Sequence, residues 1–246
     1  MIFDSVVGYD GLEYSYVSKE SGGYISRNRN IFNYFHLNRL DQFVLECAVY
    51  GTPIFKLGSS GNKILILSGI HGNELSSQIA CLKLLNEYVH KKINHTLYFI
   101  PFAAPYATMN NDRNYHYSDL NRSAHIKGSL SNRILECVKK LDIDFVGDFH
   151  TTALNSNPGC EAVFASKSPT AESYLISEFI SKDTDSHNIV FPVAGASYKG
   201  AIEDECNIMG IPAITGEVLS PFGAVGKGSV ERSYNQMKSF SDYFGL

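Results

Sequence analysis

Long apolar segments are missing from this 246-residue sequence. None approaches the roughly 18 to 20 consecutive apolar residues that a membrane helix requires. The first twenty residues also lack a basic start followed by an apolar segment, so we expect no signal peptide. No basic run is interleaved with aromatic residues, and the formal net charge is −4. We therefore expect no nucleic-acid partner and no membrane association.

Paired cysteines are missing as well. The chain has five cysteines, an odd number, widely spaced and without a Cys-x-x-Cys motif. This pattern favours reduced structural thiols over a disulfide framework or a cysteine zinc site, and with them a cytoplasmic location.

Two common enzyme signatures are also absent. The Gly- and Ser-containing segments 58–61 and 195–200 both miss the spacing of the nucleophile turn of serine hydrolases. No Gly-x-x-x-x-Gly-Lys-Ser/Thr loop for phosphate binding is present. The sequence therefore disfavours a serine hydrolase and a phosphate-loop enzyme.

What the sequence does have is an alternation of short apolar runs and amphipathic stretches from residue 43 onward, without repeats or a long linker. Residues 1–42 lack clear periodicity, and we expect them to be an N-terminal extension packed on the core. The apolar runs predict strands at residues 43–50, 63–69, 96–101, 145–149, 161–165, 188–192 and 212–218. Apolar residues at three- and four-residue spacing predict helices at residues 74–90, 129–141, 169–181 and 229–244.

Strands that alternate with helices predict one α/β domain over residues 1–246. We expect a mixed, mostly parallel central sheet with helices on both faces. In such sheets, ligands bind beyond the carboxyl ends of the strands. Polar residues that directly follow predicted strands are therefore the first candidates for a functional site.

Two such strand ends carry potential metal ligands. His71 and Glu74 lie where the run 63–69 meets a predicted helix, and residues three apart on such a turn can converge on one ion. His150 directly follows the run 145–149 and so lies at the same edge of the sheet. Two imidazoles and a carboxylate, with a position left for water, are the ligands of catalytic zinc. The sequence thus predicts one zinc ion per chain.

Other interpretations of these residues remain open at this point. The spacing of His71 and Glu74 is equally compatible with a histidine that caps the helix region and a glutamate that meets the first-turn amides. Asp148 is compatible with an outer contact that orients His150 or with a buried sheet residue. The other six histidines have no such placement, and we expect most of them at the surface.

Four segments together resemble the zinc metallocarboxypeptidase superfamily, which includes aspartoacylase and succinylglutamate desuccinylase. They are His-Gly-Asn-Glu at 71–74, Asp-Leu-Asn-Arg at 119–122, the stretch 148–160 and Thr-Gly-Glu-Val at 215–218. Their order and intervals match from about residue 43 to the end of the sequence. The resemblance implies a zinc carboxypeptidase-like fold and a hydrolase that cleaves an amide bond next to a free carboxylate.

The same resemblance implies roles for further residues. Glu217 matches the catalytic glutamate, and Arg113 lies near the position of the arginine that polarises the scissile carbonyl. Asn121 and Arg122 match the pair that binds a substrate carboxylate, and the planar fork of an arginine suits such a ligand. The alternative for Glu217 is an ion-paired core carboxylate. The apolar strand around it, where an unpaired charge would be costly, favours a functional role instead. Lys127 matches nothing, and we expect a surface lysine.

The sequence leaves the substrate open. The chain length and the continuation of the 71–74 motif resemble the bacterial murein tripeptide amidases, which predicts a carboxypeptidase for a small peptide or muropeptide of the γ-D-Glu–diaminopimelate type. The stretch 148–160 resembles aspartoacylase, and the alternative is a deacylase of N-acyl amino acids. A non-catalytic zinc- or ligand-binding protein is the alternative of another class. The oligomeric state stays unknown.

The resemblance places specificity residues in the segment 195–206. Tyr198 and Glu203 are therefore candidate substrate-binding residues. The three consecutive acidic residues 203–205 could recognise a cationic group of the substrate. They are at least as compatible with a solvated helix N-terminus, where the helix dipole favours carboxylates.

Overall fold

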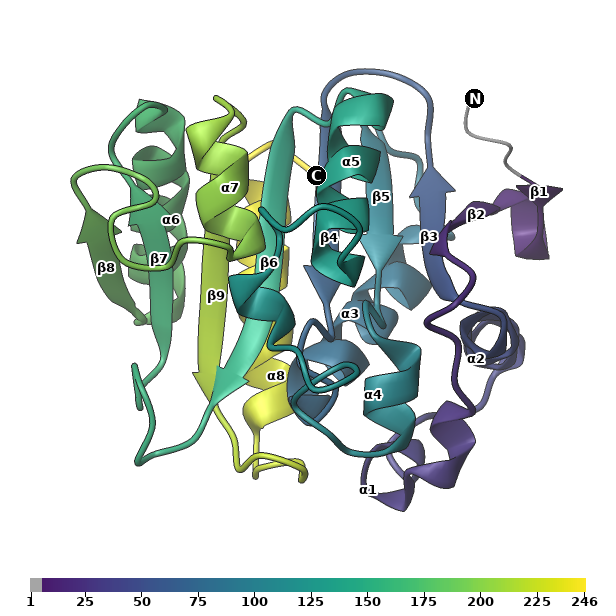
Figure 1. Cartoon of the computed structure of the whole chain (residues 1–246). Helices are drawn as coiled ribbons and strands as arrows, with labels where there is room; N and C mark the ends of the chain where they lie inside the picture. Colours follow the sequence, from purple (N-terminus) through teal and green to yellow (C-terminus); the bar gives the residue numbers. More distant parts are fainter. Residues whose placement is uncertain (1–5) are drawn as a thin grey trace.

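A computed structural model describes residues 6–246 of the chain (Figure 1). The strands are β1 (Val6–Val7), β2 (Glu13–Ser18), β3 (Thr52–Leu57), β4 (Lys63–Ser68), β5 (Thr96–Ile100), β6 (Phe145–Thr152), β7 (Ala162–Ser166), β8 (His187–Phe191) and β9 (Ala213–Leu219). The α-helices are α1 (Arg29–Phe32), α2 (Arg39–Val49), α3 (Leu75–Tyr88), α4 (Pro105–Met109), α5 (Leu130–Leu141), α6 (Ala171–Thr184), α7 (Ile202–Ile208) and α8 (Ser229–Asp242).

All of these strands form one mixed sheet in the order β1-β2-β3-β5-β4-β6-β9-β7-β8. The four adjacent strands β5, β4, β6 and β9 are parallel, so their carboxyl ends lie at one edge, the lower one in Figure 1. Antiparallel pairings of β3 with β5 and of β7 with β9 flank this centre. The predicted α/β class, with a single mixed sheet covered by helices on both faces, is confirmed.

Helices cover both faces of the sheet. Helices α5 and α7 lie in front of it in Figure 1, whereas α3, α6 and α8 lie behind. The strand β4 shows how the sequence produces this arrangement. Its side chains Ile64 and Ile66 pack into the core on one face, and Leu65 and Leu67 pack into the core on the other. A strand buried on both faces has a continuous apolar sequence, as residues 64–67 have.

One predicted strand is wrong. Residues 43–50 belong mostly to the helix α2, which begins after Asn38, whose side chain accepts a hydrogen bond from the backbone of Asp41. The buried side chains Leu40, Val44 and Ala48 recur at four-residue spacing, the period of a helix. The other predicted strands and helices coincide with elements of the same type. The strands β1, β2 and β3 and the helices α1, α4 and α7 were not predicted.

The N-terminal segment contributes to the sheet. The strand β2 pairs antiparallel with β3, and the Asn28 side chain donates a hydrogen bond to the carbonyl oxygen of Thr108. The backbone N–H of Tyr106 donates a second bond to the carbonyl oxygen of Ser21. Residues 1–5 of the expected extension lie outside the described residues.

The five cysteines are all free. Burial raises the pKa of the Cys81 thiol to about 12, so this side chain stays neutral and packs as a small apolar group. None of the helices described over residues 6–246 has the length and apolar character needed to span a bilayer.

The contact between α8 and β6 generates a prediction about stability. The Phe240 side chain is fully buried, and its ring centroid lies 6.0 Å from that of Phe149. Phe240→Ala is expected to lower the free energy of unfolding by about 3 to 5 kcal/mol in urea denaturation, because it leaves a cavity between helix and sheet. Leu175→Ala, at a side chain 45% exposed, is the control with an expected change within about 0.5 kcal/mol. Equal losses in the two variants would contradict this account of the core.

Candidate metal centre

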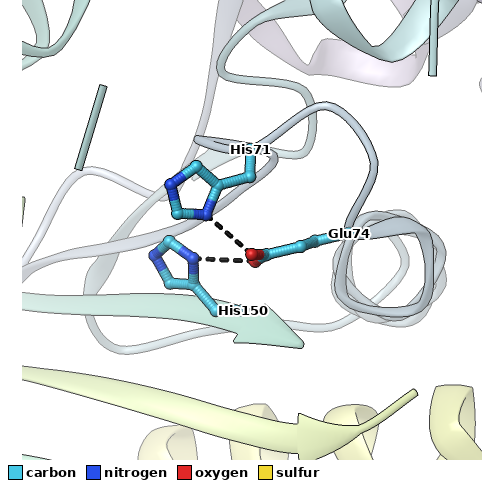
Figure 2. Close-up of side chains that lie close together, drawn as sticks. All are labelled: His71, Glu74 and His150. Carbon is cyan, nitrogen blue, oxygen red and sulfur yellow. Dashed lines mark hydrogen bonds and ion pairs between the residues drawn. The ribbon is translucent and has the colours of Figure 1, made fainter. Parts of the chain in front are cut away.

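Three residues from two neighbouring strand ends form a buried cluster (Figure 2). His71 and Glu74 follow β4, and His150 lies near the end of β6, which pairs in parallel with β4. One potential ligand atom from each residue lies within 4.8 Å of the others. The structure therefore brings together the three residues that the sequence predicts as metal ligands.

Glycine residues shape the turn that presents His71 and Glu74. Gly69 has φ +77°, a left-handed conformation that favours glycine. At Gly72, a Cβ atom would lie 2.2 Å from the carbonyl carbon of Ala107, so only glycine allows the two backbones to approach this closely. Glu74 stands at the N-cap position of α3, but its side chain makes no capping hydrogen bond there. The helix-capping alternative for Glu74 is thus excluded.

The carboxylate of Glu74 lies between the two imidazoles (Figure 2). His71 Nδ1 lies 2.7 Å from Glu74 Oε1, and His150 Nδ1 lies 2.8 Å from Glu74 Oε2. The backbone N–H of Thr151 donates a further hydrogen bond of 3.1 Å to Oε2. The two inner nitrogens and the carboxylate oxygens therefore face a common point.

The outer nitrogen of each histidine faces another carboxylate. His71 Nε2 lies 3.0 Å from Asp119 Oδ1. His150 Nε2 lies 3.0 Å from Asp148 Oδ2, an ion-pair distance without hydrogen-bond alignment. A carboxylate on the outer nitrogen keeps a proton there and leaves the Nδ1 lone pair free for a cation. This chemistry fits a metal ion. Asp148 is both an outer contact of His150 and a buried sheet residue.

The pKa values of these groups follow from their charges. Burial would raise the pKa of Glu74, but His71 and His150 outweigh it and hold the pKa well below its ordinary value. Burial disfavours the charged form of His150, but Asp148 and Glu74 together raise its pKa well above the ordinary value. The pKa of Asp119 is lowered in the same way, against its burial, by His71 and then by Arg113. The centre thus holds the buried carboxylates of Glu74 and Asp148 and the partly buried one of Asp119, which a divalent cation would stabilise.

Glu217 lies on β9, the strand that pairs with β6, and His150 lies on β6. The register of β6 and β9 pairs the two residues directly. Glu217 Oε2 is buried without a hydrogen-bond partner, and no ion pair of this side chain occurs within residues 6–246. Burial and then the carboxylate of Glu74 raise the Glu217 pKa, against the charge of His150. The alternative of an ion-paired core carboxylate is not what the structure contains.

Arg113 borders the centre from the loop that follows α4. Its guanidinium donates hydrogen bonds to Glu74 Oε1 at 3.2 Å and to Asp119 Oδ2 at 3.4 Å. Sequence reasoning assigned no role to Asp119, although it is the first residue of the Asp-Leu-Asn-Arg motif. This motif was the signal that could have identified Asp119. The contact of Asp119 with His71 could not, because 48 residues separate them along the chain.

A cavity of about 310 Å³ adjoins the centre. Every predicted site residue except His150 lines it, including Asn121, Arg122, Tyr198 and Glu203. Lys127 is exposed and does not contribute. The wall also includes Asn157 and Phe222, for which the sequence offered no signal.

Tyr198 and Arg122 support each other at the cavity mouth. The Arg122 guanidinium lies 5.1 Å from the centroid of the Tyr198 ring, and the Tyr198 hydroxyl accepts a hydrogen bond of 2.8 Å from Asn157 Nδ2. The Arg122 side chain also donates to the carbonyl oxygen of Asn121, at 2.6 Å. Stacking on an aromatic ring restricts the orientation of a guanidinium, so the contact with Tyr198 limits how the Arg122 side chain can point.

The acidic residues 203–205 form the first turn of α7, and each has a different environment. Asp204 Oδ1 accepts a hydrogen bond of 2.8 Å from the backbone of Gly195, and Glu205 Oε1 accepts one of 3.1 Å from that of Gly200. Both bonds hold the loop that carries Tyr198. Glu203 lines the cavity and is 4% exposed. Glu203 and Asp204 are buried, so a solvated helix terminus is excluded for them.

Comparisons with known proteins match the part of the chain that contains these residues. A family model described as succinylglutamate desuccinylase/aspartoacylase catalytic domain matches residues 60–218. A search of curated protein sequences finds no match.

Three solved structures with this fold illustrate its range. An aspartoacylase family protein from Mesorhizobium loti shares 20% identity at a TM-score of 0.58, with 77% of this chain and 61% of that chain covered. A succinylglutamate desuccinylase/aspartoacylase from Rhodobacter sphaeroides shares 17% at 0.58, covering 80% and 60%. A metallo-carboxypeptidase from Burkholderia cenocepacia shares 12% at 0.59, covering 79% and 62%. The chain spans about three fifths of the length of these proteins, and at these identities the likeness concerns the fold.

Metal binding is the prediction that follows from this centre. Metal-free protein is expected to take up one zinc ion per chain, measured by elemental analysis. At a free zinc concentration 100-fold above Kd, binding adds about 2.7 kcal/mol to the free energy of unfolding. His150→Ala and Glu74→Gln are expected to abolish both effects, whereas His36→Ala, at an exposed histidine, keeps them. Undiminished zinc content in His150→Ala would show that the ion binds elsewhere.

Proposed function

The chain belongs to the family of succinylglutamate desuccinylase/aspartoacylase catalytic domains, and we propose that this metallohydrolase holds one zinc ion and cleaves an amide bond next to a free carboxylate. The family model covers well over half of the chain. The observation that carries the proposal is that one cavity is lined by two residues of the cluster, His71 and Glu74, and by further charged side chains. These side chains are Glu217, Arg113 and Arg122.

His71, Glu74 and His150 are the proposed zinc ligands. Two imidazole nitrogens and one carboxylate form a ligand set of catalytic zinc sites, and both histidines have the outer carboxylate that such ligands need. When bound there, zinc supplies a Lewis acid that polarises an amide carbonyl and lowers the pKa of water.

Glu217 is the proposed general base and acid. A carboxyl group can accept a proton from the attacking water and donate it to the leaving nitrogen, so that it returns to its starting state in each cycle. Two observations support this role. Glu217 lies opposite His150 in the register of β6 and β9, and its Oε2 has no hydrogen-bond partner among the described residues.

Arg113 and Arg122 are proposed to hold the two negative charges of the reaction. Arg113 donates to Glu74 and so lies beside the reacting carbonyl, where a fixed cation stabilises a developing oxyanion. Arg122, stacked on Tyr198 at the cavity mouth, pairs with the free carboxylate of the substrate, and Asn121 adds a hydrogen bond. A non-catalytic binding protein has no need for Glu217 and Arg113 in one cavity.

For the substrate, we propose a small peptide or muropeptide, of the γ-D-Glu–diaminopimelate type, with a free terminal carboxylate. The resemblance of the 71–74 motif and its continuation to murein tripeptide amidases supports this class. The name of the matching family favours a second candidate, a deacylase of N-acyl amino acids.

A substrate screen tests this choice. Zinc-loaded protein is expected to hydrolyse γ-D-glutamyl–diaminopimelate peptides, detected as released diaminopimelate by mass spectrometry. Amidation of the terminal carboxylate should abolish cleavage, because Arg122 then loses its anionic partner. Exclusive hydrolysis of N-acyl amino acids would overturn the peptidase assignment in favour of the deacylase.

A second prediction concerns the general base. Glu217→Gln is expected to bind zinc as the unaltered protein does and to lower kcat by about 100-fold or more, because the amide cannot accept the water proton. Glu231→Gln, at an exposed glutamate in the first turn of α8, is the matched control and should keep full activity. Activity of Glu217→Gln equal to that of the control would exclude Glu217 as the base.

A further inference from the structure

The strand β9 has different neighbours on its two faces. Thr215 and Glu217 line the cavity, whereas Gly216 between them faces α8, which covers the rear face of the sheet in Figure 1. A Cβ atom at Gly216 would lie 2.7 Å from Oε1 of Gln236 on α8, so the helix lies directly against the backbone of the strand. Contacts behind β9 can therefore affect where the proposed general base lies.

On one side of β9, the pairing with a neighbouring strand ends at Glu217. The register of β7 and β9 extends from Phe164–Thr215 to Ala162–Glu217, whereas β9 continues to Leu219. On its other side, β9 pairs with β6 through Leu219. Beyond Glu217, no described strand bonds to the β7 side of β9, so other groups must satisfy its backbone there.

Two charged side chains take the place of the missing strand. Glu161 Oε1 accepts a hydrogen bond of 3.3 Å from the backbone N–H of Leu219. Arg232 Nη2 donates one of 2.9 Å to the Leu219 carbonyl oxygen, and Arg232 Nε lies 2.7 Å from Glu161 Oε1. This ion pair joins α8 to the residue before β7, and it bonds both backbone groups of Leu219 as an adjacent strand would.

Gln236 bonds to the backbone of Glu217 itself. Its Nε2 donates hydrogen bonds of 3.1 Å to the Glu217 carbonyl oxygen and 3.0 Å to Ser186 Oγ, and the Ala162 carbonyl oxygen lies 3.4 Å from the same nitrogen. The side chain is 1% exposed, and its Oε1 has no hydrogen-bond partner among residues 6–246. A buried unpaired oxygen costs free energy of folding, so the donor that Gln236 supplies to β9 better explains its presence.

The position of the Glu217 carboxyl group depends on such backbone contacts. Its Oε2 has no hydrogen-bond partner among the described residues that would orient the side chain. The backbone pairs with His150 on β6, so the strand also sets the distance to the metal cluster. A displacement of about 1 Å at a reacting group can lower the rate about 100-fold. Groups behind β9 can thus affect the proposed reaction although they do not line the cavity.

We propose that Gln236 is a positioning residue for Glu217, and that the ion pair of Arg232 with Glu161 is the second part of the same anchor. The anchor holds the carboxyl end of β9 from the rear face of the sheet and keeps the Glu217 carboxyl group directed at the metal cluster. This inference rests on the proposed function, because Glu217 is taken to be the general base. Gln236 contacts neither substrate nor metal and acts through the strand.

Kinetics of matched variants test this role. Gln236→Met removes the donor at nearly unchanged size, and we expect kcat to fall about 10- to 100-fold with KM and zinc content unchanged, because Arg122 and the proposed zinc ligands lie on other segments. Asn235→Leu makes a similar change at an exposed neighbour on α8 and should leave kcat unchanged. Arg232→Gln, at a partly exposed side chain, is expected to lower kcat about 3- to 10-fold and serves if Gln236→Met fails to fold.

A double variant separates positioning from a general structural effect. In the Glu217→Gln background, Gln236→Met should lower the residual kcat no further, because its effect requires the carboxyl group of Glu217. An equal loss of kcat in both backgrounds, or no loss in Gln236→Met alone, would overturn the inference.

Hydrogen exchange separates this inference from the proposed hydrolysis. Gln236→Met is expected to raise the exchange rates of the backbone amides of residues 217–219 about 10-fold, whereas Asn235→Leu should not change them. If these rates rise but the unaltered protein cleaves no amide substrate, the hydrolase proposal fails and the anchor of β9 stands. Unchanged exchange at these residues in Gln236→Met would show that Gln236 does not hold the strand.

Discussion

The two oxygens of the Glu74 carboxylate each contact a different histidine, and the rest of the site depends on this arrangement. One histidine shares the turn of Glu74, and the other comes from the neighbouring strand β6, so the contact requires that β4 and β6 be parallel and adjacent. The same order places β9 beside β6 and Glu217 opposite His150. The order of three strands thus determines where the proposed ligands and the proposed base meet.

Contacts on the outer side of the two histidines extend the cluster into a network of charged groups. Asp119 and Asp148 face the far sides of the two imidazoles, and Arg113 contacts both Glu74 and Asp119. Buried networks of charges add little to folding stability, because the loss of hydration offsets their attraction. A network of buried carboxylates around two imidazoles is better explained by the cation that it can hold.

Sequence reasoning identified the three residues that the structure gathers in one cluster, because strand ends and apolar runs are local features. It failed at residues 43–50, where an apolar run was interpreted as a strand although its buried residues follow the helical period. It also missed Asp119, because its contact with His71 joins segments distant in the chain. The burial of Glu203 depends on how α7 packs against β6 and β9, which three consecutive acidic residues do not reveal.

The short helix α7 has a consequence for how the specificity of such an enzyme can change. Its three successive carboxylates serve the cavity wall, the bond to Gly195 and the bond to Gly200, within a single turn. An insertion or a shift of register in this turn would therefore alter the inner wall and displace the Tyr198 loop together. The inner wall of the cavity and the position of the Tyr198 loop are therefore coupled through one turn of helix.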